Sequence, residues 1–366
     1  MKLKKLFAGI VAVAMMATMA IPGFAAEVKA EDIQTDTTTA NVTVSYKLTN
    51  AGTTSPAEDF EFTIAKAGTQ YVVASAQPEL TIGKASFARG AATTTTGATA
   101  SAAIELGSLN AKFKKPGIYN YIIEQTAGST AGVTYATSNK LLLKVTVFNK
   151  VINEDTGATE IWKAYALYHL TDDSTASKWT VNGNKIDGTA IENVYTANVV
   201  NVSKTIKGSM ANHDQTFDFK AVFTVPEGLT WTPAITFAEG GITATKNDAG
   251  EWEFVLGDKD QIHFNNIPAG VTFYIAEADY TGEDDATGTK GYTTTYKYNT
   301  DNAVTGIKTD TLTMNANAAT VAYTNTKGGM IDTGVILDNA PYIALLTIVA
   351  VGAVVMIMKK RRNYED

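Results

Sequence analysis

Short runs of alternating apolar and polar residues make up most of the chain between residues 40 and 327. The clearest examples, rich in Val, Thr, Tyr and Phe, are residues 42–46, 60–64, 141–147 and 271–275. A period of two with these residue types is typical of antiparallel β-strands. No stretch of this region sustains an apolar repeat at helical spacing. The pattern therefore predicts an all-β body.

The same succession of segments occurs twice along the body. Each pass contains a Phe-acid-Phe strand, a Pro/Gly turn and a final strand that carries Asn; these are residues 60–62, 116–117 and 191–195, then 217–219, 268–270 and 321–325. Two copies of one plan predict two tandem immunoglobulin-like β-sandwich domains, over residues 41–198 and 199–327. Residues 26–40 are polar and aperiodic, and they are predicted to form a flexible leader.

The first residues have the layout of a secretory signal peptide. Lys2, Lys4 and Lys5 precede an uncharged run over residues 6–20, and small residues follow the break at residues 22–23. This arrangement predicts a signal peptide over residues 1–25, cleaved before Ala26. The alternative is an uncleaved membrane anchor, which the shortness of the apolar run disfavours.

A second apolar run lies near the other end of the chain. Residues 341–358 are apolar, and a basic cluster at residues 359–362 follows them. About 18 residues at 1.5 Å rise nearly cross the hydrocarbon core of a bilayer, and the basic cluster would stay on the cytoplasmic side. The pattern predicts a membrane segment that holds the folded body outside the cell.

The pentapeptide just before this run resembles the cell-wall sorting signal of Gram-positive surface proteins. It consists of Met330, Ile331, Asp332, Thr333 and Gly334, within residues 328–366. The resemblance implies that a sortase cuts between Thr333 and Gly334 and passes the Thr acyl group to an amine. Met330 and Ile331 replace the usual Leu-Pro, which favours a dedicated pilus-type sortase. The alternative is a simple membrane anchor.

Composition narrows the chemistry. The 366 residues include 30 basic and 37 acidic side chains, three histidines and no cysteine. The acidic balance argues against nucleic-acid binding, and the absence of Cys excludes disulfides, thiolate metal sites and a cysteine nucleophile. The sequence contains no GxSxG, HExxH or phosphate-binding motif. No metal site, no cofactor and no activity on an external substrate are predicted.

Strand parity directs three polar side chains into the second domain. Lys204 shares a strand face with Val202 and Ile206, Glu277 with Phe273 and Ile275, and Asn325 with Val321 and Tyr323. Burial disfavours the charged form of each ionisable group, so it lowers the pKa of the amine and raises that of the carboxyl. A neutral amine is a nucleophile, and a protonated carboxyl can polarise an amide carbonyl.

These groups predict attack of the Lys204 amine on the Asn325 side chain, with loss of ammonia and formation of a permanent amide. Glu277 is the predicted acid–base residue. The alternative is a buried Lys–Glu ion pair with Asn325 hydrogen-bonded nearby.

Several segments of this domain resemble the isopeptide-forming, CnaB-type domains of streptococcal-type backbone pilins. They are VSKTIKG, FDFKAVF, IPAGVTFYIAEA, GYTTTY and VAYTNTK, within residues 201–327. That family places the cross-link Lys on the first strand, Glu in mid-domain and Asn on the last strand. The resemblance therefore implies the same triad, Lys204, Glu277 and Asn325.

The first domain resembles the same family in TNAGTTSPAEDFEF and GIYNYIIEQ. However, Lys47 lies on the polar face of its strand, and Val44 takes the inward position. By the same counting Gln125 faces inward instead of Glu124, and only Asn193 is in phase. We expect this domain to lack a cross-link; the alternative triad is Lys47, Glu124 and Asn193, which a β-bulge could bring into register.

Together these features predict the backbone subunit of a sortase-assembled pilus. A pilus-type sortase would join Thr333 to Lys185 or Lys178 of another copy, and minor pilins and host surface ligands are further candidate partners. Contact with the membrane would be transient, through the C-terminal segment. The alternatives are a wall-anchored monomeric adhesin and a membrane-anchored surface protein that sortase does not cut.

Overall fold

The computed structural model describes residues 33–328, apart from residues 95, 109–110 and 284. The predicted signal peptide, the pentapeptide at residues 330–334, the membrane segment and the basic tail all lie outside the described residues. Within the described part of the chain, no helix is long and apolar enough to cross a membrane.

The described chain is all-β, and the only helical element in it is the 3-10 turn η2 (Ala74–Ala76). In its first half, a four-stranded sheet of order β5-β1-β11-β7 faces a five-stranded sheet of order β10-β9-β8-β6-β3, and β2 pairs with β4. The strands are β1 (Thr39–Leu48), β2 (Glu58–Phe60), β3 (Phe62–Gln70), β4 (Ala85–Phe87), β5 (Ala98–Glu105), β6 (Gly117–Gln125), β7 (Val133–Thr134), β8 (Lys140–Asn153), β9 (Ala158–Leu170), β10 (Val181–Lys185) and β11 (Ile191–Tyr195).

The second half repeats this architecture. Two five-stranded sheets, of order β16-β12-β21-β18-β19 and β14-β15-β13-β17-β20, form a second sandwich. The strands are β12 (Ala197–Lys207), β13 (Phe217–Thr224), β14 (Thr245–Lys246), β15 (Trp252–Leu256), β16 (Gln261–Pro268), β17 (Thr272–Glu277), β18 (Thr293–Tyr298), β19 (Val304–Thr305), β20 (Leu312–Thr313) and β21 (Ala319–Thr326).

The alternating pattern accounts for each core. In β1, Val42, Val44 and Tyr46 are fully buried, and they belong to one apolar cluster with Tyr121 and Leu143 of the facing sheet. Successive strand residues point to opposite faces, so alternation buries one face and leaves the other in water. The second sandwich has its own cluster, built in the same way from both of its sheets.

In both sandwiches the first and last strands are parallel neighbours. β1 pairs in parallel with β11, and β12 pairs in parallel with β21. Parallel neighbours need a long connection, and here that connection is the rest of each sandwich. A bond between first and last strands would therefore close nearly the whole sandwich into a loop.

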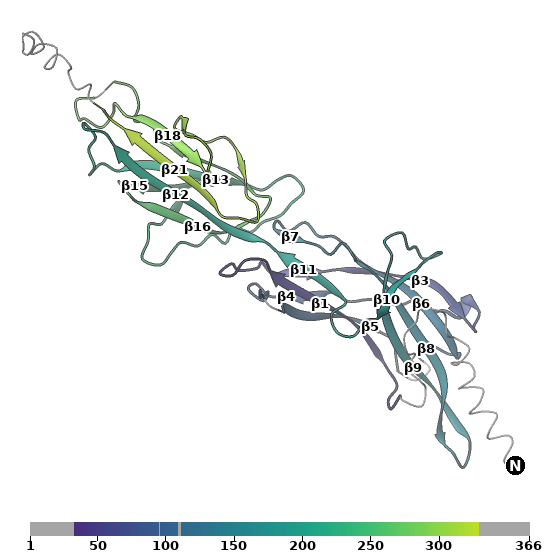
Figure 1. The fold of residues 1–366 in the computed structure, drawn as a ribbon. Coiled ribbons are helices and arrows are strands. Elements are labelled where there is room, and N and C mark those ends of the chain that lie inside the picture. The colour runs from purple at the N-terminus through teal and green to yellow at the C-terminus, as the bar shows by residue number, and fades with distance from the viewer. Residues whose placement is uncertain (1–32, 95, 109–110, 284, 329–366) are drawn as a thin grey trace, which may run out of the picture.

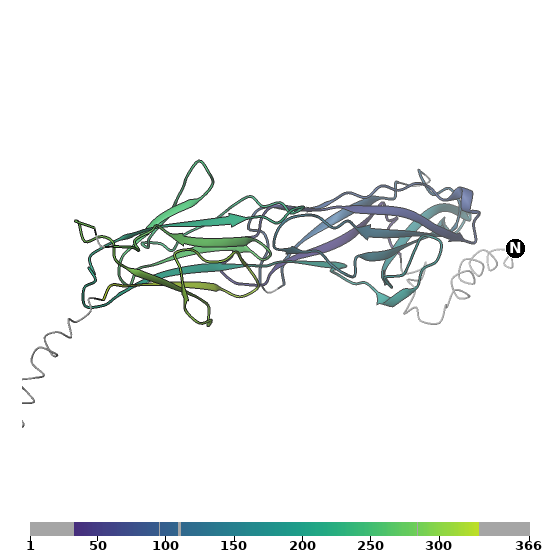
Figure 2. The same cartoon turned by 90° about the horizontal axis from the view of Figure 1, so that it is seen from above.

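The two sandwiches lie end to end and form a rod (Figures 1 and 2). Only Thr196 separates β11 from β12, so one extended segment runs from the first sandwich into the second. A loop of the first sandwich also enters the second: Ala131 is buried in the second core, and its N–H donates to the carbonyl of Thr230 at 2.8 Å. The joint is therefore packed and hydrogen-bonded.

The last part of the predicted flexible leader is docked, which corrects the expectation for residues 36–40. Asp36 accepts hydrogen bonds from the buried Lys163 ammonium at 2.7 and 3.0 Å and from its backbone N–H at 2.7 Å. The N–H of Thr37 donates to the Lys163 carbonyl at 3.1 Å. These contacts give hydrogen-bond partners to the backbone N–H and carbonyl of Lys163 on β9. Strand β1 already begins at Thr39. Sequence periodicity could not reveal these contacts because the segment is held by one charged side chain and by backbone hydrogen bonding, and neither produces an alternating pattern.

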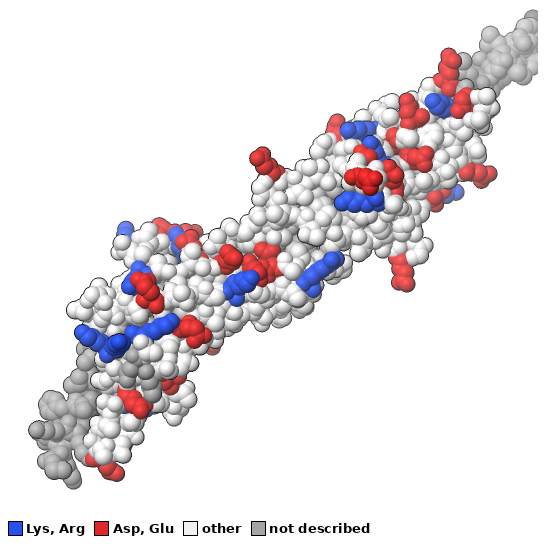
Figure 3. Space-filling view, turned by 180° about the vertical axis from the view of Figure 1, so that it is seen from behind, with Lys and Arg blue, Asp and Glu red and all other residues white. Residues whose placement is uncertain are grey.

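Acidic and basic side chains are interspersed along the rod on the face shown in Figure 3. Both sandwiches carry both signs of charge there. This mixed, charged face is typical of a surface that stays in water.

Candidate functional site

The three polar residues predicted to face the second core lie together there. β12 carries Lys204 and β21 carries Asn325, on neighbouring parallel strands; the register places Lys204 opposite Tyr323, two residues before Asn325. Glu277 ends β17 in the facing sheet, opposite Phe219 of β13. The exposed fractions are 1% for Lys204, 3% for Glu277 and 0% for Asn325. The core thus encloses an amine, a carboxyl and a carboxamide.

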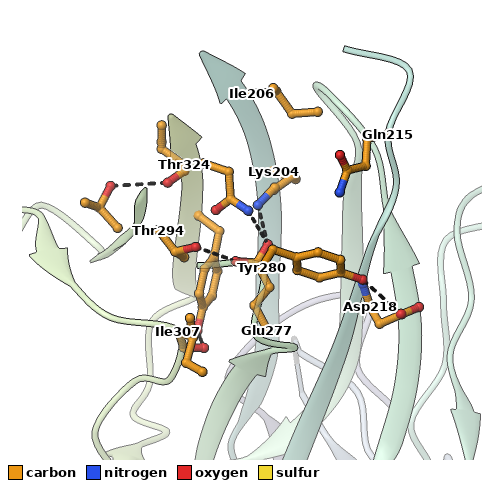
Figure 4. A network of polar contacts seen from close by, with 12 residues as sticks. Lys204, Ile206, Gln215, Asp218, Glu277, Tyr280, Thr294, Ile307 and Thr324 are labelled. Atoms are coloured by element: carbon orange, nitrogen blue, oxygen red, sulfur yellow. Dashed lines mark hydrogen bonds and ion pairs between the residues drawn. The ribbon is translucent and has the colours of Figure 1, made fainter. Parts of the chain in front are cut away.

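One carboxylate oxygen joins the other two groups. The Lys204 ammonium pairs with Oε1 of Glu277, and Nδ2 of Asn325 donates to the same oxygen at 3.0 Å. The other oxygen, Oε2, accepts a hydrogen bond from Oγ1 of Thr294 at 3.0 Å (Figure 4). Oδ1 of Asn325 is buried, and it has no hydrogen-bond partner among the described residues.

Aromatic rings surround the lysine end of the site. Nζ of Lys204 lies 3.9 Å from the ring centroid of Phe217 and 5.5 Å from that of Phe219. The hydroxyl of Tyr323 donates to the carbonyl of Ile275 at 2.8 Å, so this ring is fixed beside the carboxyl. Ring faces attract a cation weakly but solvate it far less than water does.

Burial shifts both ionisable groups toward neutrality. It lowers the pKa of Lys204 to about 8, although the charge and hydrogen bond of Glu277 oppose the shift. Burial also raises the pKa of Glu277, against the opposing effects of Lys204, Thr294 and Asn325. Both shifts lower the free-energy cost of passing a proton from the amine to the carboxyl.

The first sandwich holds a different pair at the same place. Gln125 and Asn193 are buried, and each side-chain amide donates to the other, at 2.8 and 2.9 Å. Oδ1 of Asn193 also accepts from the N–H of Ala136 at 2.9 Å. Lys47 and Glu124 do not join them: Lys47 pairs with Glu192 at the surface, and Glu124 is half-buried on the opposite strand face from Gln125.

The two lysines considered as acceptors lie on the surface of the first sandwich. Lys185 ends β10 next to a register shift, opposite Tyr168 of β9, and its side chain is exposed. Lys178 is exposed in the turn before β10, where its backbone exchanges hydrogen bonds with Thr175. Both are therefore accessible to solvent.

Sequence reasoning did not single out Thr294 as part of the site. The signal was present, because Thr294 alternates in phase with Tyr292 and Tyr296, which are both buried. Threonine is common at outward-facing strand positions, so the residue type did not suggest that Thr294 points inward. Its contact with Glu277 establishes that direction. Among the described residues, no group of three or more His, Asp or Glu side chains could hold a metal ion.

Comparison with known proteins shows which proteins this chain is similar to. Residues 42–196 match the Spy0128-like isopeptide containing domain. A pilin from Streptococcus pyogenes serotype M1 is 26% identical over 261 residues, covering 68% of this chain and 69% of that protein. The chain is related to the streptococcal pilins.

Solved structures support the same fold. The crystal structure of the major pilin from Streptococcus pyogenes has a TM-score of 0.52 at 19% identity, covering 81% of this chain and all of that one. A single-site mutant of that pilin gives a TM-score of 0.51 at 19% identity, covering 80% and 99%. At this identity the likeness concerns the fold.

The two sandwiches match different domain families, and these matches do not follow the distribution of the buried polar side chains. Residues 198–327, which contain Lys204, Glu277 and Asn325, match a domain of unknown function. The region that matches the isopeptide-containing domain instead carries the Gln125–Asn193 amide pair. The description of the matched domain therefore does not follow the distribution of the Lys, Glu and Asn side chains between the two sandwiches.

Proposed function

We propose that this chain is the structural subunit of a sortase-assembled, covalently linked surface pilus, built from two CnaB-type sandwiches. Its relation to the pilins and its end-to-end sandwiches support a pilus structural subunit. The covalent part of the proposal rests on the buried contact of Lys204 and Asn325 with one oxygen of Glu277. We propose that Lys204 and Asn325 form an intramolecular isopeptide bond there.

The bond forms in four steps. Lys204 gives a proton to Glu277, which leaves a neutral amine and a neutral carboxyl. The Asn325 amide turns over so that Oδ1 faces Oε1 of Glu277; such a turn exchanges only the two amide atoms, and Oδ1 has no described partner to lose. Nζ then attacks Cγ while Glu277 protonates Oδ1.

Collapse of the tetrahedral intermediate completes the reaction. The proton on Oδ1 returns to Glu277, the nitrogen of the former amide takes up the proton released by Nζ, and the Cγ–Nδ2 bond breaks. Ammonia leaves and accepts a proton from Glu277, which is again ionised. The product is a Lys204–Asn325 amide, and no external reagent is consumed.

The position of this bond suits a fibre under tension. β12 enters the second sandwich from the first, and the parallel β21 ends at the far end of the rod. A bond between them prevents the two strands from separating when the ends are pulled. By analogy with a disulfide, closing so long a loop also removes roughly 4–5 kcal/mol of unfolded-state entropy.

Assembly would use the two ends of the chain. A pilus-type sortase would cut between Thr333 and Gly334 and join the Thr333 carboxyl to Lys185 of another copy, with Lys178 as the second candidate. The exposure of both lysines supports this assignment. The precursor would be held at the membrane by residues 341–358, and minor pilins and host ligands would bind the assembled fibre.

Intact mass tests the intramolecular bond. The secreted chain over residues 26–333 should weigh less than its sequence mass by one ammonia, and Glu277→Gln should restore the full mass. Glu124→Gln is the matched control because Glu124 lies outside the site. A wild-type mass equal to the sequence mass would remove the cross-link from the proposal.

A blot of cell-wall extract tests the assembly. A ladder of high-mass bands that Lys185→Ala abolishes supports polymerisation through Lys185, whereas an unchanged ladder removes that lysine. A smear attached to peptidoglycan would instead indicate the monomeric adhesin. A single membrane band would indicate a protein that sortase does not cut.

A further inference from the structure

We propose that Thr294 is the positioning residue of the cross-linking reaction: its hydroxyl fixes the Glu277 carboxyl and directs the carboxyl proton to the oxygen that contacts Lys204 and Asn325. This inference rests on the proposed isopeptide bond. It adds a fourth member to the site, from a strand that carries none of the other three.

The structure places Thr294 directly against the reacting groups. β18 pairs with β21, and the register sets Thr294 opposite Asn325. The side chain is 2% exposed, and its Oγ1 lies 3.0 Å from Oε2 of Glu277. In Figure 4 the Thr294 hydroxyl points to Glu277 from a different side than Lys204 does.

The hydrogen bond from Thr294 favours one oxygen of the carboxyl as the site of the proton. A threonine hydroxyl has one hydrogen, and it is donated to Oε2 when the carboxyl is ionised. A proton on Oε2 would weaken this hydrogen bond, because a protonated oxygen is a poorer acceptor, whereas Oε1 is the oxygen that the Lys204 ammonium contacts. The proton from Lys204 is therefore transferred to Oε1. Only Oε1 contacts both Lys204 and the Asn325 amide that must be protonated.

The other groups around the carboxyl cannot take this role. Lys204, from β12, is the only cation that contacts Glu277 in the described part of the chain. Tyr323 of β21 donates its hydroxyl to Ile275, and Tyr280 donates its hydroxyl to Asp218. Burial raises the pKa of both tyrosines, so both stay neutral near pH 7. Thr294 thus supplies the only described hydrogen bond to Oε2.

The neighbouring threonine provides a matched control. Thr295 lies on the same strand with its side chain on the opposite face, where Oγ1 donates to the Thr324 carbonyl at 3.4 Å. Thr295→Val removes the same hydroxyl from the same strand without touching Glu277. Thr294→Ser keeps the hydroxyl at the site, and Thr294→Val replaces it with a methyl group of similar size.

The test follows the loss of ammonia with time. Residues 26–333 are made by cell-free synthesis as wild type, Thr294→Val, Thr294→Ser and Thr295→Val, and the intact mass is recorded at intervals between pH 5 and 9. We expect Thr294→Val to form the bond at least roughly tenfold more slowly, because the Glu277 carboxyl is no longer held in position against Lys204 and Asn325. Thr294→Ser and Thr295→Val should match wild type.

The pH profile separates positioning from a merely structural role. The hydrogen bond from Thr294 lowers the pKa of Glu277, so its removal should move the acid limb of the rate profile to higher pH. If wild type loses ammonia and Thr294→Val does so at the same rate with the same profile, the inference is wrong. If wild type loses none, the proposed cross-link itself fails.

Folding is checked in the same samples by near-ultraviolet circular dichroism. Should Thr294→Val fail to fold, Thr294→Ala takes its place. A slow Ala variant beside a normal Ser variant supports the inference, and an Ala variant with the wild-type rate overturns it.

Discussion

Val44 occupies in the first sandwich the strand position that Lys204 occupies in the second. Val44 lies opposite Ile191, two residues before Asn193, and Lys204 lies opposite Tyr323, two residues before Asn325. The facing sheets agree, because Gln125 lies opposite Phe62 as Glu277 lies opposite Phe219. Equivalent strand positions therefore hold a potential Lys–Asn cross-link in the second sandwich, and an apolar residue with two amides in the first.

This relationship predicts that two substitutions introduce a cross-link into the first sandwich. Val44→Lys with Gln125→Glu places an amine and a carboxyl beside Asn193, in the arrangement of the second site. The intact mass of residues 26–333 should then fall by two ammonia molecules instead of one. The longer side chain must fit a closed core, so we expect an overpacking cost of about 1–3 kcal/mol before the bond forms.

The same double variant with Asn193→Ala provides the control. Without the amide carbon there is nothing for the amine to attack, and the mass should return to the loss of one ammonia. A folded Val44→Lys/Gln125→Glu chain that still loses only one would show that strand register alone does not define the site.

The Gln125–Asn193 pair predicts a noncovalent contribution to the stability of the first sandwich. Asn193→Ala leaves the buried Gln125 amide and the N–H of Ala136 without their partner. An unsatisfied buried polar group costs about 1–3 kcal/mol, so the midpoint of urea unfolding should fall accordingly.

Asn182→Ala is the comparison for this experiment, because Asn182 is exposed on β10. It should leave the midpoint within the error of the measurement. An Asn193→Ala midpoint equal to that of Asn182→Ala would mean that the amide pair adds nothing to stability.

The Asp36–Lys163 pair predicts that the docked leader stabilises the first sandwich. Asp36→Ala leaves Lys163, which is 1% exposed, as a buried cation without its carboxylate. Breaking a buried pair in this way typically costs about 3–5 kcal/mol, which should lower the thermal midpoint by several degrees.

Removing both charged side chains separates the contribution of the ion pair to stability from that of the surrounding contacts. Asp36→Ala with Lys163→Met should recover most of the lost stability, since no buried charge remains. If the double variant is as unstable as Asp36→Ala, the loss comes from the leader's backbone contacts and not from the charge.

The buried Lys204–Glu277 pair predicts a bell-shaped pH dependence for the rate of isopeptide bond formation. In the proposed reaction, the reactive state holds one proton that Lys204 and Glu277 share. Above the pKa of Lys204, about 8, the pair loses that proton and Glu277 cannot protonate the amide, so the rate should fall about tenfold per pH unit. At low pH a second proton keeps the amine charged, and the rate should fall again.

Intact mass recorded during synthesis at a series of pH values gives this profile. A rate that keeps rising above pH 9 would mean that a neutral amine is sufficient and that Glu277 is not the acid. A surface variant such as Lys220→Ala should leave the profile unchanged, because Lys220 pairs with Glu251 on the strand face opposite to that of the buried Phe219.

Alternation along the chain was enough to predict the fold class and the inward direction of the polar groups in the second sandwich. Period-two alternation decides which face of a strand is buried, so Lys204, Glu277 and Asn325 could be directed into the core before any contact was known. The same counting gave Val44 and Gln125 their inward positions in the first sandwich. These are properties of single strands, and each strand carries them in its own residues.

Which of these groups contact one another depends on how the strands pair and the sheets pack. Strand pairing across more than a hundred residues sets Lys204 beside Asn325, and sheet packing brings Glu277 and Thr294 to them. Docking of Asp36 against Lys163 and insertion of Ala131 into the second core also join distant segments. Alternation specifies a face but not a partner, because register depends on the free energy of the whole packed sandwich.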